Sequence, residues 1–262
     1  MLQSLELNGV NVTMPDVRHR RRNWKKAFHA MDLLLKDGED TKQAFEIINA
    51  LAGRSVERSF GRFLETASGR GLFERREELA GILDDHAFLR QLPAGSFGCA
   101  YLTFVTSEGL SAQGLVDENG KIENYQPDNP NDDLAWYSRR LRDMHDLWHV
   151  LTGYGRDGLG ELALLAFSYS QSRNPGLMFI AYLGARADRK DLGFPQAMKV
   201  IWSAKAAGKR AAFLPSVDVV DLFARPLDEV RRSLCIESPL TYLDVLPDFL
   251  DRWNQRKLQA AL

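Results

Sequence analysis

An apolar stripe at helical spacing runs from residue 134 to residue 148 and does most to limit how this chain can fold. Its members recur every three or four positions and are Leu134, Tyr137, Leu141, Met144 and Trp148. That spacing places all of them on one face of an α-helix, which must be buried against other elements. The preceding YQPDNPNDD (residues 125–133) holds two prolines and is predicted to be a loop.

Most other segments also have helical patterns. DTKQAFEIINALAG, residues 40–53, begins with a capping Asp40 or Thr41 and stops at Gly53. SFGCAYLTFVTS (residues 96–107) predicts a more buried helix, and NPG at 174–176 separates two strongly apolar ones. The turn VDENGK, residues 116–121, is the best candidate for a strand pair. We therefore expect a mainly α, single-domain helical bundle with at most a small β-hairpin.

The charge balance and the cysteines narrow the class of protein. Thirty-four basic and thirty-five acidic residues give a net charge of −1, whereas a general nucleic-acid binder needs a basic surface. We expect small-molecule or protein partners and no nucleic acid. Cys99 and Cys235 form no CxxC pair, so neither a disulfide framework nor a thiolate zinc site is indicated. A reducing cytosol fits this usage.

The N-terminal MLQSLELNGVNVTMPD lacks the basic start and the apolar run of a secretion signal. The mature protein is expected to begin near here, with residues 1–22 as a mobile arm. The most apolar segment, LMFIAYLG at 177–184, is much shorter than the roughly 20 residues that span a bilayer. No transmembrane helix is predicted.

The stretch MHDLWHVLTGYGRDGLGE, residues 144–161, concentrates the side chains that can do chemistry. Its glycines spell GxGxxG, but a dinucleotide fingerprint follows a strand, and a helix precedes this one. A metal site explains more, because His145 and His149 are one helical turn apart and project from the same face. Asp146 lies beside His145. Glu161 follows after eleven residues, whose glycines allow turns tight enough to return it to the histidines.

These four residues form a candidate site of two histidines and two carboxylates. Imidazole and carboxylate ligands without thiolate suit zinc, iron, cobalt or manganese. Asp146 is either the fourth ligand, which we favour, or an acid/base beside the metal. Histidines at this spacing can also simply border a buried face. The other histidines have no second histidine or spaced carboxylate beside them in the sequence and are interpreted as surface or core residues. They are His19, His29 and His86.

The same motif resembles a known family, the ubiquinone (coenzyme Q) biosynthesis protein Coq4. The family's HDxxH-x11-E signature matches the four candidate residues without a gap. The similarity also covers AFEIINALAG, LPAGSFGCAYLTF, VLTGYGRDGLGELALLAF and the region from WSAKAAGKR to PLDEVRRSLCI. We therefore divide the chain into an N-terminal arm (1–22), a helical Coq4-like domain (23–240) and a C-terminal helical extension (241–262).

The resemblance implies metal-dependent decarboxylation at ring C1 of a 4-hydroxy-polyprenylbenzoate in ubiquinone biosynthesis, either simple or oxidative with hydroxylation at that carbon. It makes zinc the expected metal and assigns the catalytic and metal-binding roles to the four candidate residues, His145, Asp146, His149 and Glu161. The implied partners are a prenylated benzoate or quinone lipid, other ubiquinone biosynthesis proteins, the membrane surface and further copies of the chain. The expected location is the cytoplasm of a bacterium, peripheral on the inner face of the cell membrane.

Two basic stretches are candidates for contact with anionic lipid, RHRRRNWKK (residues 18–26) and KVIWSAKAAGKR (residues 199–210). A charge run is more often a solvated helix face. A long prenyl tail also needs shelter from water, because each buried methylene contributes about 0.8 kcal/mol. We expect a tunnel beside the metal, lined by residues of the apolar helices from Leu162 to Ala185. The alternative is that the large side chains of these helices merely form the core: Leu164, Leu165, Phe167, Phe179 and Tyr182.

Three other functions compete with the decarboxylase. A zinc peptidase would have HExxH, where this chain has HDxxH. An HD-type metal phosphohydrolase also uses a His-Asp pair but needs further ligands, for which His86 is the candidate. The main rival is a non-catalytic prenyl-lipid-binding scaffold of a biosynthetic complex. If all four side chains enclose a structural metal, no coordination position remains for a substrate.

Overall fold

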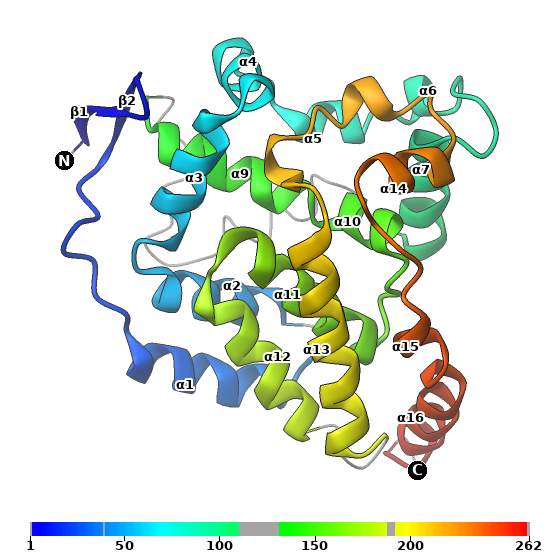
Figure 1. Ribbon diagram of the computed structural model, residues 1–262. Coiled ribbons are helices and arrows are strands. Elements are labelled where there is room, and N and C mark those ends of the chain that lie inside the picture. Colours follow the sequence, from blue (N-terminus) through cyan, green and yellow to red (C-terminus); the bar gives the residue numbers. More distant parts are fainter. Residues whose placement is uncertain (1, 39, 110–130, 188–191, 261–262) are drawn as a thin grey trace.

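The computed structural model describes residues 2–38, 40–109, 131–187 and 192–260, with side chains through residue 255. Over these ranges the chain is mainly helical, which confirms the predicted fold class (Figure 1). The helices are α1 (Trp24–Leu34), α2 (Thr41–Ala52), α3 (Ser55–Glu65), α4 (Ala67–Arg75), α5 (Leu79–Leu83), α6 (His86–Leu89), α7 (Phe97–Glu108), α9 (Asp133–Asp143), α10 (His145–Thr152), α11 (Gly158–Ser172), α12 (Pro175–Ala187), α13 (Phe194–Arg210), α14 (Leu227–Ser233), α15 (Leu240–Leu243) and α16 (Leu246–Ala260), with 3₁₀ turns η2 (Leu214–Ser216) and η3 (Val220–Leu222).

A β-hairpin stands at the N-terminus, in the segment expected as a mobile arm. Strands β1 (Leu2–Leu7) and β2 (Val10–Pro15) pair antiparallel. Asn8 and Gly9 form the turn with φ of 51° and 79°, and Asn-Gly suits a two-residue hairpin loop because both residues tolerate positive φ. The Asn8-Gly9 turn pattern was readable from the sequence, but the hairpin was not predicted. The strand pair predicted at 116–121 lies outside the described residues.

Two of the predicted helices form, and the first of them starts at the predicted capping residue Asp40. The Asp40 side chain accepts a hydrogen bond from the Gln43 N–H at 3.4 Å and so starts α2, and Gly53 ends that helix with φ 52°. Ser96 caps α7 in the same way, accepting from the Cys99 N–H at 3.3 Å. A side-chain oxygen at the cap satisfies an amide that the helix leaves unpaired, which is why these residue types mark helix starts.

The long helix predicted from the apolar stripe is divided into two, so that prediction was wrong at Met144. The Met144 N–H reaches the carbonyls of both Arg140 and Arg142, which tightens the end of α9 before α10 begins. A buried ion pair between Arg142 and Asp143, with Nε and Oδ1 2.7 Å apart, lies at this corner. The side chains of the stripe are therefore divided between two separate cores.

The smaller core joins the hairpin to α3, α4 and α9. Its buried side chains include Val12 and Met14 of β2, Phe60 and Phe63 of α3, and Trp136 of α9. The larger core gathers side chains from the other helices, including Met144 and Trp148 from the second half of the stripe. The histidine-bearing helix therefore belongs to the larger core, while α9 belongs to the smaller one.

Helix α11 has a central place in the larger core, because α12 and α13 both pack on it and α2 packs against α12 (Figure 1). The Ser170 hydroxyl donates to the Lys205 carbonyl at 2.7 Å, and the Gln171 amide donates to the Gly208 carbonyl at 2.7 Å. A Cβ at Gly208 would lie 2.5 Å from the Phe167 carbonyl oxygen. Glycine at this position lets α11 and α13 approach closely enough for both hydrogen bonds.

The predicted C-terminal extension, residues 241–262, packs on the larger core. Tyr242 of α15 and Phe249 of α16 are both buried in it. The boundaries proposed at residues 22 and 240 stay predictions. Within the described ranges, no helix has both the length and the apolar character needed to cross a bilayer.

We expect Gly208→Ala to lower the free energy of unfolding by about 1–3 kcal/mol, since an added methyl forces α13 away from α11. The control is Gly81→Ala in α5, where an added Cβ meets nothing within 4 Å. That change should be neutral or stabilise by up to about 1 kcal/mol. Urea unfolding followed by circular dichroism measures both; equal stability of Gly208→Ala and the parent would contradict the close approach.

Candidate metal centre

The candidate site lies where the end of one helix meets the start of the next. His145 and His149 project from α10, and Glu161 stands in the first turn of α11. Gly153 ends α10 with φ 77°, which reverses the chain. The Asp157 side chain starts α11 by accepting a hydrogen bond from the Gly160 N–H at 3.0 Å. The loop between the two helices therefore places all these side chains together, as the glycine spacing predicted.

The ligand atoms of the site converge closely. The two histidine Nε2 atoms are 3.3 Å apart. Glu161 Oε1 lies 3.4 Å from Nε2 of His149, and Oε2 lies 3.6 Å from Nε2 of His145. Asp146 also offers an oxygen within 4.8 Å of a ring nitrogen of each histidine. The structure thus brings Glu161 to both histidines and Asp146 to both histidines, whereas the metal-binding group found among the described residues contains Asp146 and not Glu161.

These separations fit a tetrahedral metal ion. Ligand atoms at 2.0–2.1 Å from zinc and at tetrahedral angles are separated from one another by about 3.3–3.4 Å. The measured spacings of 3.3, 3.4 and 3.6 Å between the histidine nitrogens and the Glu161 oxygens are close to that edge length. Lone pairs that face one another at this range need a cation or shared protons between them. The donor set and its spacing therefore suit a divalent ion, whose identity they do not specify.

The His149 ring is oriented by its other nitrogen. Nδ1 of His149 lies 2.9 Å from the Tyr154 carbonyl oxygen. A carbonyl oxygen only accepts, so Nδ1 carries a proton and Nε2 is the ring atom that faces the site. Phe104 of α7 stacks on the same ring, with centroids 5.5 Å apart. His149 is therefore fixed in both tautomer and plane.

One side of the site is open and the other is closed. The side chains of His145 and Glu161 are each 31% exposed, whereas that of His149 is fully buried. Arg156, whose side chain is 32% exposed, places Nε 3.5 Å from Glu161 Oε1. The open side is therefore bordered by a cation as well as by two candidate ligands.

Charge coupling favours an ionised Glu161. Burial raises the pKa of Glu161, but hydrogen bonds to His145 and His149 and their charges outweigh it and hold the pKa well below its usual range. Burial lowers the pKa of His145, and the hydrogen bond and charge of Glu161 reverse this into a net increase. The ionised carboxylate is the form of Glu161 that binds a cation, whereas His145 has to give up its proton to a bound metal.

Asp146 lies on the buried side of the site, with 4% of its surface exposed. Its negative charge reaches Tyr101 of α7: burial first and Asp146 second raise the pKa of that phenol. Asp146 thus faces both the histidines and α7, and either role predicted for it, fourth ligand or acid/base, is compatible with this place.

Several residues around the site were not predicted. Tyr154, Arg156 and Asp157 all lie inside the quoted motif and were available as polar residues in the loop. Phe104 and Tyr242 approach from distant parts of the chain, so no local pattern could have identified them. The other histidines lie outside the metal-binding group found among the described residues: His19 and His29 are exposed and His86 is half-buried. The phosphohydrolase alternative therefore gains no extra ligand from His86.

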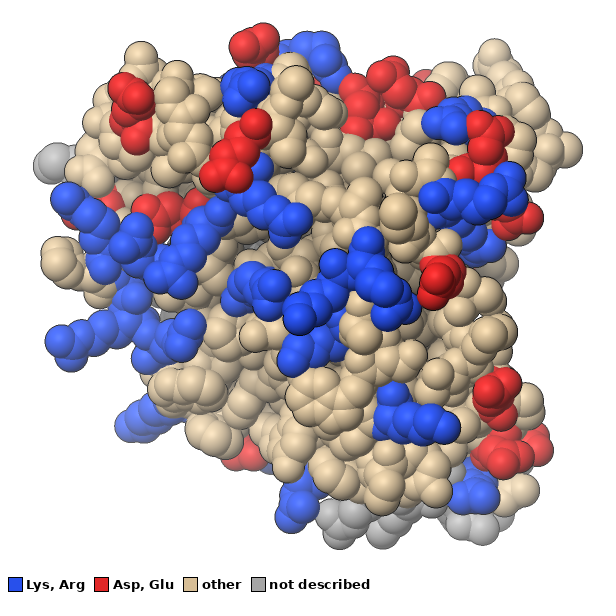
Figure 2. Space-filling view, viewed as in Figure 1, with Lys and Arg blue, Asp and Glu red and all other residues tan. Residues whose placement is uncertain are grey.

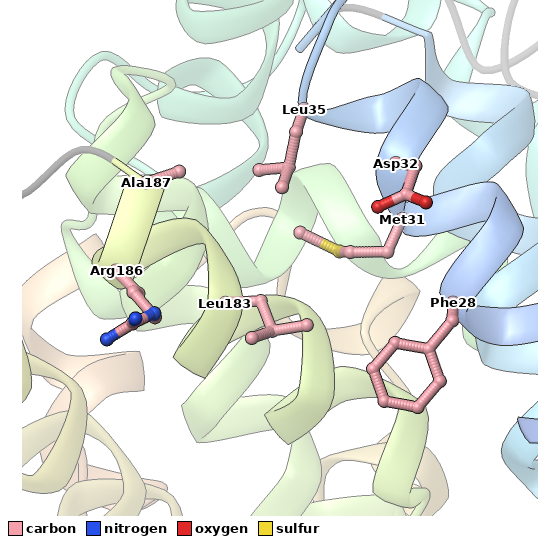
Figure 3. Close-up of a pocket in the computed structure, with 7 residues that line it drawn as sticks. All are labelled: Phe28, Met31, Asp32, Leu35, Leu183, Arg186 and Ala187. Carbon is pink, nitrogen blue, oxygen red and sulfur yellow. The ribbon is translucent and has the colours of Figure 1, made fainter.

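The predicted tunnel lining is only partly accessible. Leu164 and Phe167 expose 0% and 1% of their surfaces, so both are packed core side chains that offer no open wall. A hollow of about 340 Å³ does involve α12, but it lies against α1, where Phe28 and Met31 face Leu183 (Figure 3). A tunnel beside the metal stays a prediction for the remaining residues.

Residues 46–240 match the family model of the coenzyme Q (ubiquinone) biosynthesis protein Coq4. The chain belongs to the Coq4 family. The resemblance noted from the HDxxH-x11-E signature is thereby confirmed, and the family places the protein in ubiquinone biosynthesis.

Curated Coq4 relatives are distant in sequence. The ubiquinone biosynthesis protein coq4, mitochondrial, of Aspergillus clavatus is 28% identical over 178 residues, covering 67% of this chain and 59% of the relative. The corresponding Coccidioides immitis protein is 25% identical over 221 residues, covering 82% of this chain and 69% of the relative. The chain thus spans about three fifths of the length of the first of these Coq4 proteins.

A crystal structure from Nostoc punctiforme has a similar fold. It is of a protein assigned provisionally to ubiquinone biosynthesis, and it superposes with a TM-score of 0.60 at 20% identity, over 83% of this chain and all of the other. At that identity the likeness supports the Coq4 fold alone.

We expect His149→Ala to abolish stoichiometric binding of a divalent metal, because it removes the most buried ligand. The loss of affinity should exceed the roughly 10- to 100-fold that removal of an outer-shell partner costs. Equilibrium dialysis with elemental analysis measures this, and the exposed His29 of α1 supplies the control, since His29→Ala should bind as the parent does. Equal metal content in His149→Ala and the parent would contradict the site.

Proposed function

We propose that the protein is a metal-dependent decarboxylase, a carbon–carbon lyase that acts at ring C1 of a 4-hydroxy-polyprenylbenzoate in ubiquinone biosynthesis. Membership in the Coq4 family supports the pathway. The exposure of the site favours a catalytic metal over a structural one. Two candidate ligands, His145 and Glu161, are each 31% exposed on one side. Catalytic metal sites keep a coordination position open, whereas structural sites are closed by protein.

His145, His149 and Glu161 would hold the ion, and Asp146 is the fourth ligand or the acid/base beside it. A bound divalent ion would act as a Lewis acid that offsets negative charge developing on the substrate. The protein orients the candidate ligands. The Tyr154 carbonyl fixes the tautomer of His149, and Arg156 holds the Glu161 carboxylate through an ion pair on the open side. Zinc is the expected metal, with iron, cobalt or manganese as alternatives.

Decarboxylation breaks the bond between C1 and the carboxylate and leaves its electron pair on the ring. Carbon dioxide departs, and C1 takes up a proton in the simple reaction. Asp146, buried beside the histidines, is the candidate to deliver that proton if it is not a ligand. A route with hydroxylation at C1 needs oxygen as a co-reactant instead, so the atmosphere of the assay separates the two routes.

Arg156 is the cation best placed to receive an anionic substrate. Its Nε lies 3.5 Å from Glu161, and its side chain is part-exposed at the open side of the site. A guanidinium can bind a carboxylate through two parallel hydrogen bonds. Such a contact would favour a benzoate over its decarboxylated product, and product release would follow from the loss of that charge.

The test of the proposal is the purified, metal-loaded protein with a synthetic prenylated 4-hydroxybenzoate, with and without oxygen, analysed by mass spectrometry. The expected result is loss of the carboxyl group, with a hydrogen or a hydroxyl at C1 according to the atmosphere. A protein that binds both metal and lipid but yields no such product, alone or with the other pathway proteins, is the non-catalytic scaffold.

We expect Arg156→Ala to weaken binding of the carboxylate substrate by about 10- to 100-fold, because a hydrogen bond to a charged group contributes roughly 1.5–3 kcal/mol. Binding of the corresponding phenol without the carboxyl group should change little. Titration of both ligands, with Arg232→Ala on the exposed part of α14 as control, measures the difference. Equal weakening of acid and phenol would contradict recognition of the carboxylate by Arg156.

The first of the two predicted basic stretches combines clustered cations with exposed aromatic side chains in three dimensions. Arginines gather around a hollow of about 390 Å³. Figure 2 shows a dense group of basic side chains at the left of the molecule. They are Arg20, Arg21, Arg22, Arg54 and Arg58, and Trp24 lies beside them. Trp24 and Phe28 are 46% and 52% exposed, which leaves an aromatic patch next to the cations. We propose that this face contacts anionic lipid at a membrane surface.

The second stretch, residues 199–210, is less free to do so. Trp202 is 49% exposed, but Nζ of Lys205 already stands 4.5 Å above the Trp202 ring and 5.4 Å above that of Tyr169. The partnership with other ubiquinone biosynthesis proteins and a homo-oligomeric state are also proposals, which the family context suggests.

We expect charge reversal at Arg20, Arg21 and Arg22 to abolish flotation with liposomes that contain anionic phospholipid, since each basic residue near such a surface contributes about 1 kcal/mol. Neutral liposomes should bind the parent weakly. An equal reversal at the exposed Arg90, Arg232 and Arg252 is the control. Flotation that falls equally in both triple variants would indicate an effect of net charge alone.

A further inference from the structure

The loop between the two ligand-bearing helices is held by a residue from outside the part of the chain that matches the family model. That match ends at residue 240, and α15 carries Tyr242 just beyond it. Tyr242 is 2% exposed, and its hydroxyl lies against the loop rather than against α16. An element from the C-terminal extension is thus built into the support of the candidate metal centre.

We propose that Tyr242 is a positioning residue for the metal, which sets the ligands through Asp157 and Tyr154. This inference rests on the proposed metal site. Tyr242 touches neither the ion nor the ligands themselves, so its effect must pass through the two loop residues. Each of these residues controls a different ligand.

The first connection leads to Glu161. The Tyr242 hydroxyl donates a short hydrogen bond to Asp157 Oδ2 and accepts one from the Gly155 N–H at 3.1 Å. The other oxygen of Asp157 caps α11, and the Asp157 carbonyl accepts from the Glu161 N–H at 3.0 Å. The helix that carries Glu161 therefore begins at a residue whose carboxylate is shared with Tyr242.

The second connection leads to His149. The Tyr242 ring packs edge-on against the Tyr154 ring, with centroids 5.5 Å apart. The Tyr154 carbonyl is the acceptor that fixes the His149 ring. A partner that orients a ligating histidine is worth 10- to 100-fold in metal affinity in known sites. Tyr242 thus packs against the residue whose carbonyl orients the His149 ring.

The loop has no spare room in which to rearrange around Tyr242. A Cβ at Gly155 would come within 2.8 Å of both the Tyr242 hydroxyl and Asp157 Oδ2. A Cβ at Gly160 would come within 2.2 Å of the Gly155 carbonyl oxygen. Burial, and then the hydrogen bond and charge of Asp157, raise the pKa of Tyr242. The phenol therefore keeps its proton and remains a donor over the working range of pH.

The test compares metal binding by the full chain and by Tyr242→Phe, which removes the hydroxyl and keeps the ring against Tyr154. We expect the dissociation constant for Co²⁺ to rise about tenfold. The visible absorption of the bound Co²⁺, which reports the arrangement of its ligands, should also shift. Asp157→Asn keeps one oxygen, which can serve the cap, and replaces the acceptor for Tyr242 with an NH2 group, so it should lose less affinity than Asp157→Ala.

The matched control is Phe249→Leu in α16, a buried residue of the same extension that packs in the larger core. It should lower thermal stability but leave the Co²⁺ affinity and spectrum unchanged. Unchanged affinity and spectrum in Tyr242→Phe would overturn the inference while leaving the metal site intact. Absence of Co²⁺ and Zn²⁺ binding by the parent chain would overturn the metal site and this inference together.

Discussion

The seating of α11 against α13 is the interaction on which the rest of the structure depends. Two hydrogen bonds, one part-buried and one buried, and the close approach at Gly208 fix the C-terminal half of α11. Glu161 stands in the first turn of the same helix, so the position of one metal ligand is decided by core packing several turns away. A rigid helix transmits this placement at no further cost in conformational entropy.

The histidines reach the same point by a different route. They are carried by α10, a short helix separated from α9 at Met144. Because the corner at Met144 belongs to the larger core, α10 takes its orientation from that core and not from the hairpin and its neighbours. Two independently anchored helices thus meet at the site, and the loop from Gly153 to Asp157 joins them. Preorganised ligands of this kind bind an ion without first ordering the chain.

The fold class and the placement of His145 and His149 on one helix face could be predicted from the sequence because each depends on local spacing. Helical periodicity, the cap at Asp40 and the one-turn separation of His145 and His149 are properties of neighbouring residues. The break at Met144 could not be predicted, since it follows from the division between two cores that only the folded chain defines. The Asn8–Gly9 hairpin was readable but was missed, because the segment was interpreted as an arm. Tyr242 lay beyond reach, because 85 residues separate it from the loop residue that it binds.

The unequal burial of the two histidines sets an order for ion capture. His149 is closed off beneath Phe104 and held by a backbone carbonyl, whereas His145 and Glu161 border the open side. An ion entering from the open side would meet His145 and Glu161 first, exchange coordinated waters for them, and reach the preset nitrogen of His149 last. Departure would follow the reverse path, so the bond to the least mobile candidate ligand would govern how long the ion remains.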